Sequence, residues 1–361
     1  MRAFDRHRAI ATFLLFAASC GLCATIAGLL VYLDVLRTPW LEDLERAYQV
    51  RVGSSGSARI LVLGDSFLAR WNTDPHLKQE LEAYASERKI RLVNAAGYGL
   101  GPADYRARMQ KLAAEFEPDL VLIFYFVGND LTDVQYRVRS FQPARPPGAK
   151  PLTIDPSCQI ASSSKRRPGG KFDWDAMLRH GIDPTLVEMA RRVAYAQNPP
   201  DERINPWLLT LAMSAPRFLL DNILMDSECN AAAWRMSAAI LSEIFAIARG
   251  VGAEVQVVAI PSTVQIDRSH FDVYRRSTLQ VDDRLLESTR PQQLLGELCA
   301  RHDVPFLDLL PYFERHPDPA SLYWRFDPHF SAAGHRLAFE ILRKQVLDPW
   351  VERNRPAVAV R

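Results

Sequence analysis

Uninterrupted apolar runs alternate with segments of helical pattern from residue 58 onward. We expect strands at 59–63, 90–94, 119–127, 254–260 and 305–309. We expect helices at 76–87, 103–116, 231–250, 291–302 and 332–346. Apolar runs without polar interruption are typical of strands that are buried on both faces of a parallel sheet. The alternation therefore predicts an α/β fold in which helices form right-handed crossovers between parallel strands.

The alternation stops at about residue 131 and resumes near 231. Up to Lys171 this segment is rich in proline, serine and arginine, and helix-like pieces follow at 184–195 and 206–225. Loops of this length are unusual unless they are functional or disordered. We expect an insertion at about 131–230, part loop and part lid, over the C-terminal edge of the sheet. A second irregular stretch is expected between the strand at 254–260 and about residue 290.

The N-terminal segment has a different pattern. From Ala9 to Leu33 it carries no charged residue, which exceeds the roughly 20 residues that cross a bilayer. Arginines precede this run and mainly acidic residues follow it, so the positive-inside rule keeps the N-terminus in the cytoplasm. We expect a single-pass signal anchor of the cytoplasmic (inner) membrane, with the rest of the chain on the periplasmic or extracellular side. A cleaved signal peptide is the alternative, because Ala17-Ala-Ser-Cys20 resembles a lipoprotein site.

These patterns give the expected division of the chain. It comprises a cytoplasmic stub and transmembrane anchor at 1–34, a juxtamembrane helix and linker at 35–57, a main domain at 58–350 and a tail at 351–361. The formal net charge of +2 and the lack of a basic stripe argue against a nucleic-acid partner.

Three cysteines lie beyond the anchor. Cys158 and Cys229 fall in loop-like sequence, where a disulfide can persist outside the cytoplasm. Sequence does not supply the geometry of that pairing. Cys299 falls on the apolar side of a helix, and we expect it to be buried.

The first strand ends on Gly64-Asp65-Ser66. Reactive groups of α/β proteins lie where parallel strands end, and the free N–H groups of the following turn favour negative charge there. Ser66 is therefore a candidate nucleophile, although Gly-Asp-Ser is also a common turn sequence. A serine needs a base that a third group orients.

His329 has the best context for that base, in a predicted turn between the last strand and the last helix. Asp327, two residues earlier, is placed to orient its imidazole. His335 competes, but its position at the start of a helix indicates packing or capping.

An oxyanion hole is the remaining requirement for acyl transfer. The backbone N–H of Ser66, that of a glycine in the loop after the second strand and the side-chain amide of Asn129 are the candidate donors. Gly99 is favoured over Gly97 as this glycine. Asn129 is otherwise an ordinary residue at the end of a strand, and Asp130 a helix cap.

Gly64-Asp65-Ser66, the glycine loop after Asn94, Gly128-Asn129-Asp130 and Asp327-Pro-His329 resemble, in order and separation, the four sequence blocks of the SGNH (GDSL) hydrolases. The resemblance covers about 58–130 and 231–346. It implies a flavodoxin-like three-layer α/β/α fold with a five-stranded parallel sheet. It also implies Ser66 as nucleophile, His329 as base and Asp327 as its orienting acid, with Ser66, Gly99 and Asn129 as oxyanion donors.

Many members of that family have Asp-x-x-His where this chain has Asp-x-His, a spacing that resembles membrane-anchored members that modify polysaccharides. The resemblance implies no metal or organic cofactor. It suggests hydrolysis or transfer of an acyl group on an exported glycan, with a membrane-bound O-acyltransferase as possible partner. A general carboxylesterase or lipase-like enzyme, whose acyl pocket is lined by the apolar segments that contain Trp207 and Phe218, is one alternative. A non-catalytic scaffold that binds a membrane enzyme or a glycan is another.

Overall fold

The computed structural model of the chain describes residues 58–69, 76–138, 140–144, 150–158, 172–195 and 204–354. The expected membrane anchor and juxtamembrane segment lie outside the described residues, as do residues 355–361 of the expected tail. Residues 351–353 of that tail belong instead to the last helix, α17 (Asp348–Arg353), in which Trp350 is 2% exposed.

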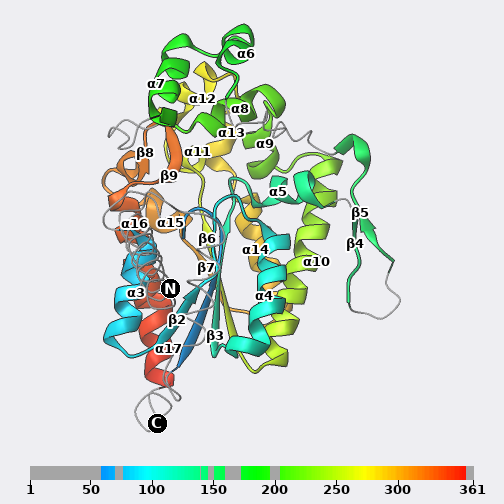
Figure 1. The fold of residues 1–361 in the computed structure, drawn as a ribbon, viewed down its shortest axis with the longest axis vertical. Helices are drawn as coiled ribbons and strands as arrows, with labels where there is room; N and C mark the ends of the chain where they lie inside the picture. The colour runs from blue at the N-terminus through cyan, green and yellow to red at the C-terminus, as the bar shows by residue number, and fades with distance from the viewer. Residues whose placement is uncertain are drawn as a thin grey trace, which may run out of the picture. The chain divides into compact units, whose positions relative to one another are not determined.

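A five-stranded parallel sheet forms the centre of the fold, as predicted (Figure 1). Its strands, in spatial order, are β2 (Arg91–Asn94), β1 (Arg59–Leu63), β3 (Leu120–Phe126), β6 (Glu254–Ile260) and β7 (Phe306–Asp308). This is the flavodoxin-like order, in which the chain reverses direction across the sheet next to the first strand. All seven residues of β3 are buried, because the strand is central and is covered on both faces.

Helices cover both faces of the sheet (Figure 1). On one face lie α3 (Leu77–Glu87) and α16 (Ala332–Leu342), and on the other α4 (Pro102–Phe116), α10 (Glu228–Gly250) and α14 (Arg290–Arg301). Cys299 of α14 is 1% exposed, as expected. After α16 the chain stays helical through a π-helical turn (Arg343–Leu347) into α17, so the last helical segment is longer than predicted.

A cap of short helices lies beyond the C-terminal ends of the strands (Figure 1). The insertion supplies α6 (Trp174–Arg179), α7 (Pro184–Tyr195), α8 (Pro206–Ser214) and α9 (Phe218–Ile223). The prediction of one helical piece across 206–225 is wrong, because the segment forms two helices, α8 and α9. Pro216 lies between them and lacks the N–H that a continuous helix needs.

The second stretch expected to be irregular is helical and completes the cap. It forms α11 (Thr263–Ile266), a 3₁₀ turn (Arg268–His270), α12 (Phe271–Arg276) and α13 (Arg284–Glu287). Arg276 forms an ion pair with Asp183 at 3.0 Å, and Gln280 N–H donates to the Pro216 carbonyl at 2.8 Å. These contacts join the two parts of the cap. The sequence pattern missed these helices because each spans fewer than two helical turns.

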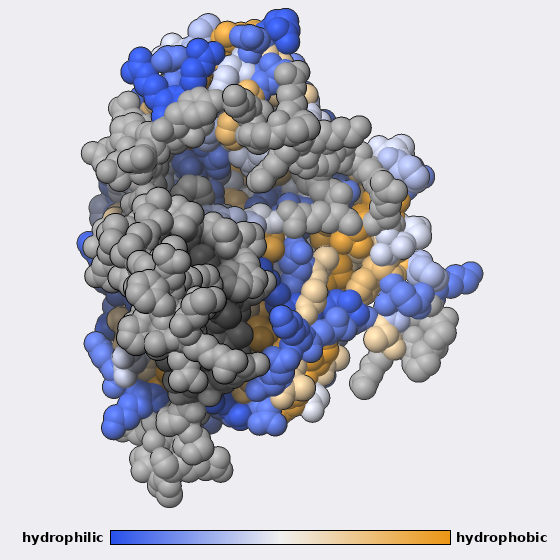
Figure 2. Space-filling view, viewed as in Figure 1, coloured by the Kyte–Doolittle hydropathy of each residue, from blue (hydrophilic) through white to orange (hydrophobic). Residues whose placement is uncertain are grey.

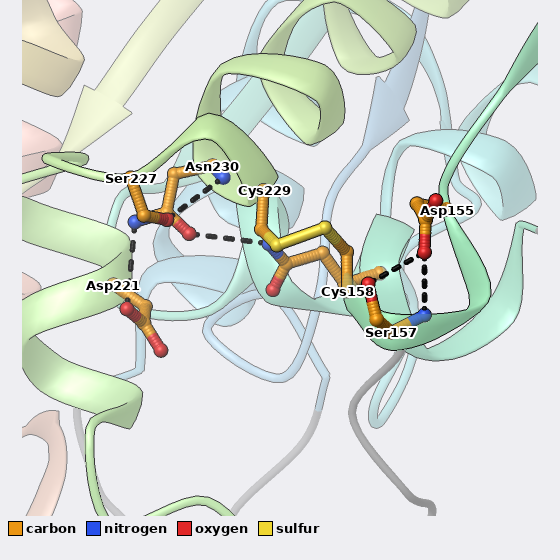
Figure 3. Close-up of a disulfide and its surroundings, with 8 residues drawn as sticks. Asp155, Ser157, Cys158, Asp221, Ser227, Cys229 and Asn230 are labelled. Atoms are coloured by element: carbon orange, nitrogen blue, oxygen red, sulfur yellow. Dashed lines mark hydrogen bonds between the residues drawn. A yellow bond between two sulfur atoms is a disulfide. The ribbon is translucent and has the colours of Figure 1, made fainter.

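The early part of the insertion lies beside α10. Helix α5 (Asp130–Arg137) is followed by a small antiparallel pair, β4 (Ser140–Phe141) and β5 (Leu152–Thr153), and by a 3₁₀ turn (Pro156–Cys158). Cys158 forms a disulfide with Cys229 at the start of α10, with 5.1 Å between the Cα atoms (Figure 3). The expected pairing is confirmed. The disulfide fastens the segment from β4 to Cys158 to the start of helix α10.

Replacing both Cys158 and Cys229 by serine is expected to lower the free energy of unfolding by about 4 kcal/mol, because the cross-link closes a long loop in the unfolded chain. The two residues are 71 positions apart in the sequence. Thermal unfolding of the oxidised wild type, the reduced wild type and the double variant measures the effect. The reduced wild type should have the same Tm as the double variant, and both should unfold below the oxidised wild type. Equal Tm values for all three would contradict this expectation.

Among the described residues, α10 alone is long and apolar enough to cross a membrane. Half of its most apolar window is buried within the molecule, and apolar residues gather over this helix on the face seen in Figure 2. Its neighbours are α4, α5 and the sheet. One face of α10 is therefore packed against the α/β layer.

Candidate active site

Ser66 lies on the turn that follows β1. A Cβ atom at Gly64 would lie 3.2 Å from the Cβ atom of Phe124, so glycine allows β1 to pass close to β3 just before the turn. The turn is closed by hydrogen bonds from Leu68 N–H to the Asp65 carbonyl and from Ala69 N–H to the Ser66 carbonyl, at 3.3 and 3.2 Å. Ser66 is 9% exposed, so its hydroxyl lies in a sheltered position at the C-terminal edge of the sheet.

His329 and Asp327 lie on a short hairpin rather than in the plain turn expected from the sequence. The hairpin pairs β8 (Tyr323–Trp324) with β9 (Asp327–Phe330). The Tyr323 hydroxyl donates to the Pro261 carbonyl at 2.6 Å, which fixes the hairpin to the end of β6. Asn205 N–H donates to the Phe326 carbonyl at 3.3 Å, so the cap holds the hairpin from the other side.

The structure brings Ser66, His329 and Asp327 into one hydrogen-bonded chain. Ser66 Oγ lies 2.7 Å from His329 Nε2, and His329 Nδ1 is hydrogen-bonded to Asp327 Oδ1. The same carboxylate oxygen accepts the backbone N–H of His329 at 3.1 Å. Because a carboxylate only accepts, the ring proton lies on Nδ1 and leaves Nε2 to accept the serine hydroxyl.

The imidazole of His329 is 13% exposed and lies against Phe67, with 5.1 Å between the ring centroids. Burial alone would lower its pKa. The charge of Asp327, the hydrogen bond to Asp327 and the charge of Asp65 together outweigh burial, and the pKa of His329 is raised above its ordinary 6.5. The base is therefore stabilised as an imidazolium once it has taken a proton.

The candidate oxyanion donors lie on the loops beside Ser66. Asn129 precedes α5, and its Nδ2 lies 3.4 Å from Asp65 Oδ2, directly beside the Ser66 turn. Gly97 N–H donates to the Gly64 carbonyl at 3.3 Å and is therefore engaged. Gly99 follows in the left-handed conformation, with φ 59°, at the exposed part of the same loop. The structure thus holds Asn129 near Ser66 by a direct bridge, and places Gly99 on the adjacent loop.

Asp130 is not the simple helix cap considered from the sequence. Its fully buried carboxyl accepts the Tyr105 hydroxyl and the Phe126 N–H, each at 3.0 Å. Burial, followed by the charges of Asp65 and Asp133, raises its pKa well above the ordinary value. Asp130 therefore holds α5 to the end of β3.

His335 has the packing role expected from the sequence. It is 2% exposed and stacks on His76, with 4.1 Å between the ring centroids. Burial, then the charges of His76 and His329, lowers its pKa well below the ordinary value. A neutral His335 therefore forms part of the wall near the reactive histidine.

A small open pocket lies over the hydrogen-bonded chain. Its lining residues are Ser66, Phe67, Trp324, Asp327, His329, Phe330 and His335. Within the part of the chain that the structure describes, no three His, Cys, Asp or Glu side chains are grouped as metal ligands would be. The contact of Asp65 with Asn129 was missed from the sequence, since no local pattern reports which loops of two neighbouring strands meet.

Comparison with protein families matches residues 62–337 to the GDSL-like lipase/acylhydrolase family. Similar solved structures include a lipase/acylhydrolase from Enterococcus faecalis, with 14% identity, 81% of this chain and 96% of that chain covered, and a TM-score of 0.40. A GDSL-like lipase from Bacteroides thetaiotaomicron has 8% identity, 85% and 98% coverage, and a TM-score of 0.40.

An acetylxylan esterase from Geobacillus stearothermophilus has 14% identity, 81% and 95% coverage, and a TM-score of 0.39. At such scores the likeness carries no argument about substrate or mechanism. No curated protein matches the chain in sequence. The family match spans most of the chain and includes the Ser66 turn, Asn129 and His329. The chain therefore belongs to the GDSL-like lipase/acylhydrolase family of ester-hydrolysing enzymes.

Proposed function

We propose that the protein is a serine ester hydrolase or acyltransferase in which Ser66 is the nucleophile, His329 the base and Asp327 its orienting acid. The observation that carries this proposal is a pair of hydrogen bonds. Ser66 Oγ lies 2.7 Å from His329 Nε2, and His329 Nδ1 is hydrogen-bonded to Asp327. A nucleophile and a base in hydrogen-bond contact, with the base oriented by a third group, are what activation of a serine requires.

In the first half of the reaction, Ser66 Oγ attacks the ester carbonyl carbon while His329 Nε2 takes the hydroxyl proton. The carbonyl oxygen becomes negative and is stabilised by the Ser66 N–H, the Gly99 N–H and the Asn129 amide. The tetrahedral intermediate then collapses, the bond to the alcohol oxygen breaks, and His329 returns its proton to that oxygen. The acyl group remains as an ester of Ser66.

In the second half, a water or a sugar hydroxyl takes the place of the departed alcohol. His329 removes the proton of this acceptor as its oxygen attacks the acyl carbon. Collapse of the second tetrahedral intermediate releases Ser66, which recovers its proton from His329. Water gives hydrolysis, and a sugar hydroxyl gives transfer.

For the substrate, we propose a short acyl ester on an exported glycan. The pocket beside Ser66 is small and is bordered by Phe67, Trp324 and Phe330, which favours a short acyl group over a long chain. An exported location is supported by the uncharged N-terminal run and by the disulfide, which persists in oxidising compartments. In this setting a membrane-bound O-acyltransferase is a candidate partner.

The lipase-like alternative needs an extended acyl pocket in the cap. Of the apolar residues considered for it, Leu208, Leu209 and Phe218 are buried within the cap, whereas Trp207 is 43% exposed. Helix α8 packs against α6 and α7, and α9 packs against α5 and α14. The buried residues therefore serve these helix contacts, which favours the short-acyl proposal.

The test compares kcat/KM of the full-length protein for an O-acetylated polysaccharide, p-nitrophenyl acetate and p-nitrophenyl palmitate, with a Ser66→Ala variant as blank. Acetate release from the polysaccharide at a higher kcat/KM than hydrolysis of the palmitate ester is expected. A preference for palmitate would favour a lipase-like enzyme. Equal rates for wild type and blank would contradict a role for Ser66 in catalysis.

The dependence of kcat/KM on pH is a separate prediction. A general base must be neutral, so kcat/KM should fall as pH drops through the pKa of His329, which is raised above 6.5. We expect half of the plateau rate at a pH above that value, measured with p-nitrophenyl acetate between about pH 5 and pH 9. Circular dichroism at each pH separates titration from unfolding, and an acid limb below pH 6.5 in folded protein would contradict the assignment.

A further inference from the structure

We propose that Asp65 is a positioning residue, which holds the Asn129 amide as an oxyanion donor and supports the charge that develops on His329. The proposal rests on the function proposed above and names a residue that the reaction scheme does not use. Asp65 is 0% exposed, and it lies directly before the nucleophile in the chain.

The carboxylate of Asp65 joins two loops that follow different strands. Its Oδ1 accepts the Phe67 N–H at 3.0 Å, which fixes the turn that carries Ser66. Its Oδ2 accepts from Asn129 Nδ2 at 3.4 Å, across to the residue that follows β3. One buried side chain thus sets the distance between the nucleophile and a candidate oxyanion donor.

The contact also decides which way the Asn129 amide faces. A side-chain amide has two N–H donors on one end and a carbonyl acceptor on the other. An ionised Asp65 attracts the donor end and repels the carbonyl end, so the amide cannot turn over without a penalty. One N–H of Asn129 donates to Asp65. The second N–H can donate to an oxygen that becomes negative in the reaction.

Titratable groups on three elements interact with Asp65. His329 on β9 favours the ionised carboxylate, whereas Asp130 on α5 and Tyr105 on α4 carry groups whose own pKa values are raised by the charge of Asp65. Burial raises the pKa of Asp65 to about 6, and the Phe67 N–H, His329 and Asn129 limit the rise. Burial and the charge of Asp65 also raise the pKa of Asp130. Above about pH 6 the carboxyl of Asp65 is therefore mainly ionised.

The variant Asp65→Asn tests this role, because it keeps the shape and removes the charge. If the introduced amide accepts the Phe67 N–H through its carbonyl, its own NH₂ group faces the NH₂ group of Asn129. The Asn129 amide must then turn over and loses its donor toward the oxyanion. We expect kcat for p-nitrophenyl acetate to fall about 10²- to 10³-fold with little change in KM, as for loss of one oxyanion donor.

A second readout is the acid limb of kcat/KM. The charge of Asp65 contributes to the raised pKa of His329, so the limb should move to lower pH in Asp65→Asn. A third readout is the double variant with Asn129→Ala. Because both changes remove the same donor, the loss of kcat in the double variant should be much smaller than the product of the two single losses.

Asp130→Asn is the matched control. Asp130 is as buried as Asp65 and adjoins Asn129, but its carboxyl contacts Tyr105 and the Phe126 N–H. We expect its kcat to stay within about 2-fold of wild type, since the amide keeps the shape of the side chain and its carbonyl oxygen can still accept the Phe126 N–H. If Asp65→Asn does not fold by circular dichroism, Asp65→Ser serves instead, since it removes the charge without placing an NH₂ group against Asn129. It should show the same shift of the acid limb with a smaller loss of kcat.

Two results would overturn the inference. One is full additivity of Asp65→Asn and Asn129→Ala, and the other is an unmoved acid limb in both Asp65 variants. Either would leave the proposed function intact as long as Ser66→Ala is inactive. Activity in Ser66→Ala would instead remove the proposed function itself, so the two failures are distinguishable.

Discussion

Replacing His329 by alanine is expected to lower kcat/KM for p-nitrophenyl acetate by about 10⁶-fold, the size of the loss found when the base of a serine triad is removed. Without Nε2 at 2.7 Å, the Ser66 hydroxyl keeps its proton and remains a weak nucleophile. The measurement is steady-state hydrolysis by the purified full-length variant. The loss should appear in kcat more than in KM, because proton transfer occurs in the transition state.

His180→Ala is the matched control for this variant. His180 is an exposed histidine at the end of α6 in the cap, so its removal should leave kcat/KM within about 2-fold of wild type. A loss of similar size in both variants would point to a general defect of the protein. A His329→Ala variant that retains more than about a tenth of the wild-type rate would contradict the role of base.

Replacing Gly334 by alanine is expected to destabilise the protein by about 3 kcal/mol or more, although alanine normally favours a helix over glycine. Gly334 lies in the first turn of α16, and a Cβ atom there would lie 2.0 Å from the Leu322 carbonyl oxygen and 3.1 Å from the Phe330 Cβ. The backbone of the His329 hairpin occupies that space. The change must therefore shift α16 or the hairpin, and kcat should fall together with Tm.

Gly250→Ala is the comparison variant, a Gly→Ala change at a helix terminus that has room for a Cβ atom. Gly250 closes α10, and no atom lies within 4 Å of a Cβ atom built on it. We expect this variant to be neutral or more stable by up to about 1 kcal/mol. Thermal unfolding of both variants gives the comparison. Equal Tm changes for the two would show that the close approach at Gly334 does not matter.

The charge on Asp65 has a cost in stability. The pKa of Asp65 is about 6 in the folded protein against 3.8 for the free side chain. Between these values the folded state binds more protons than the unfolded state, so stability falls as pH rises through this window. At 1.36 kcal/mol per unit the loss is about 3 kcal/mol above pH 6. Retention of such a group beside the nucleophile is what a functional role predicts.

Much of the fold was predictable because its signals are local. Strand β3 is a run of seven apolar residues, and β1 is followed directly by Gly64-Asp65-Ser66, where the site begins. A parallel sheet places such strand ends at one edge, so Ser66 and Asn129 were expected to be neighbours. The pairing of Ser66 with His329, 263 residues apart, followed from the same rule applied to the last strand.

The parts that the sequence did not predict depend on contacts between distant segments. The β8–β9 hairpin consists of strands of two and four residues, too short for a periodic pattern, and is fixed by Tyr323 on Pro261. The helices between 263 and 287 are equally short and are stabilised by packing in the cap. The bridge from Asp65 to Asn129 depends on strand order, which periodicity alone does not report.

The most direct test of the account is covalent labelling of the full-length protein with a fluorophosphonate, followed by peptide mass spectrometry of wild type and Ser66→Ala. An activated serine attacks phosphorus and keeps the adduct, whereas an ordinary surface serine does not react. We expect a single adduct on Ser66 that is absent in Ser66→Ala and forms much more slowly in His329→Ala. Folded wild-type protein that carries no adduct on Ser66 would contradict the central claim that this serine is the nucleophile.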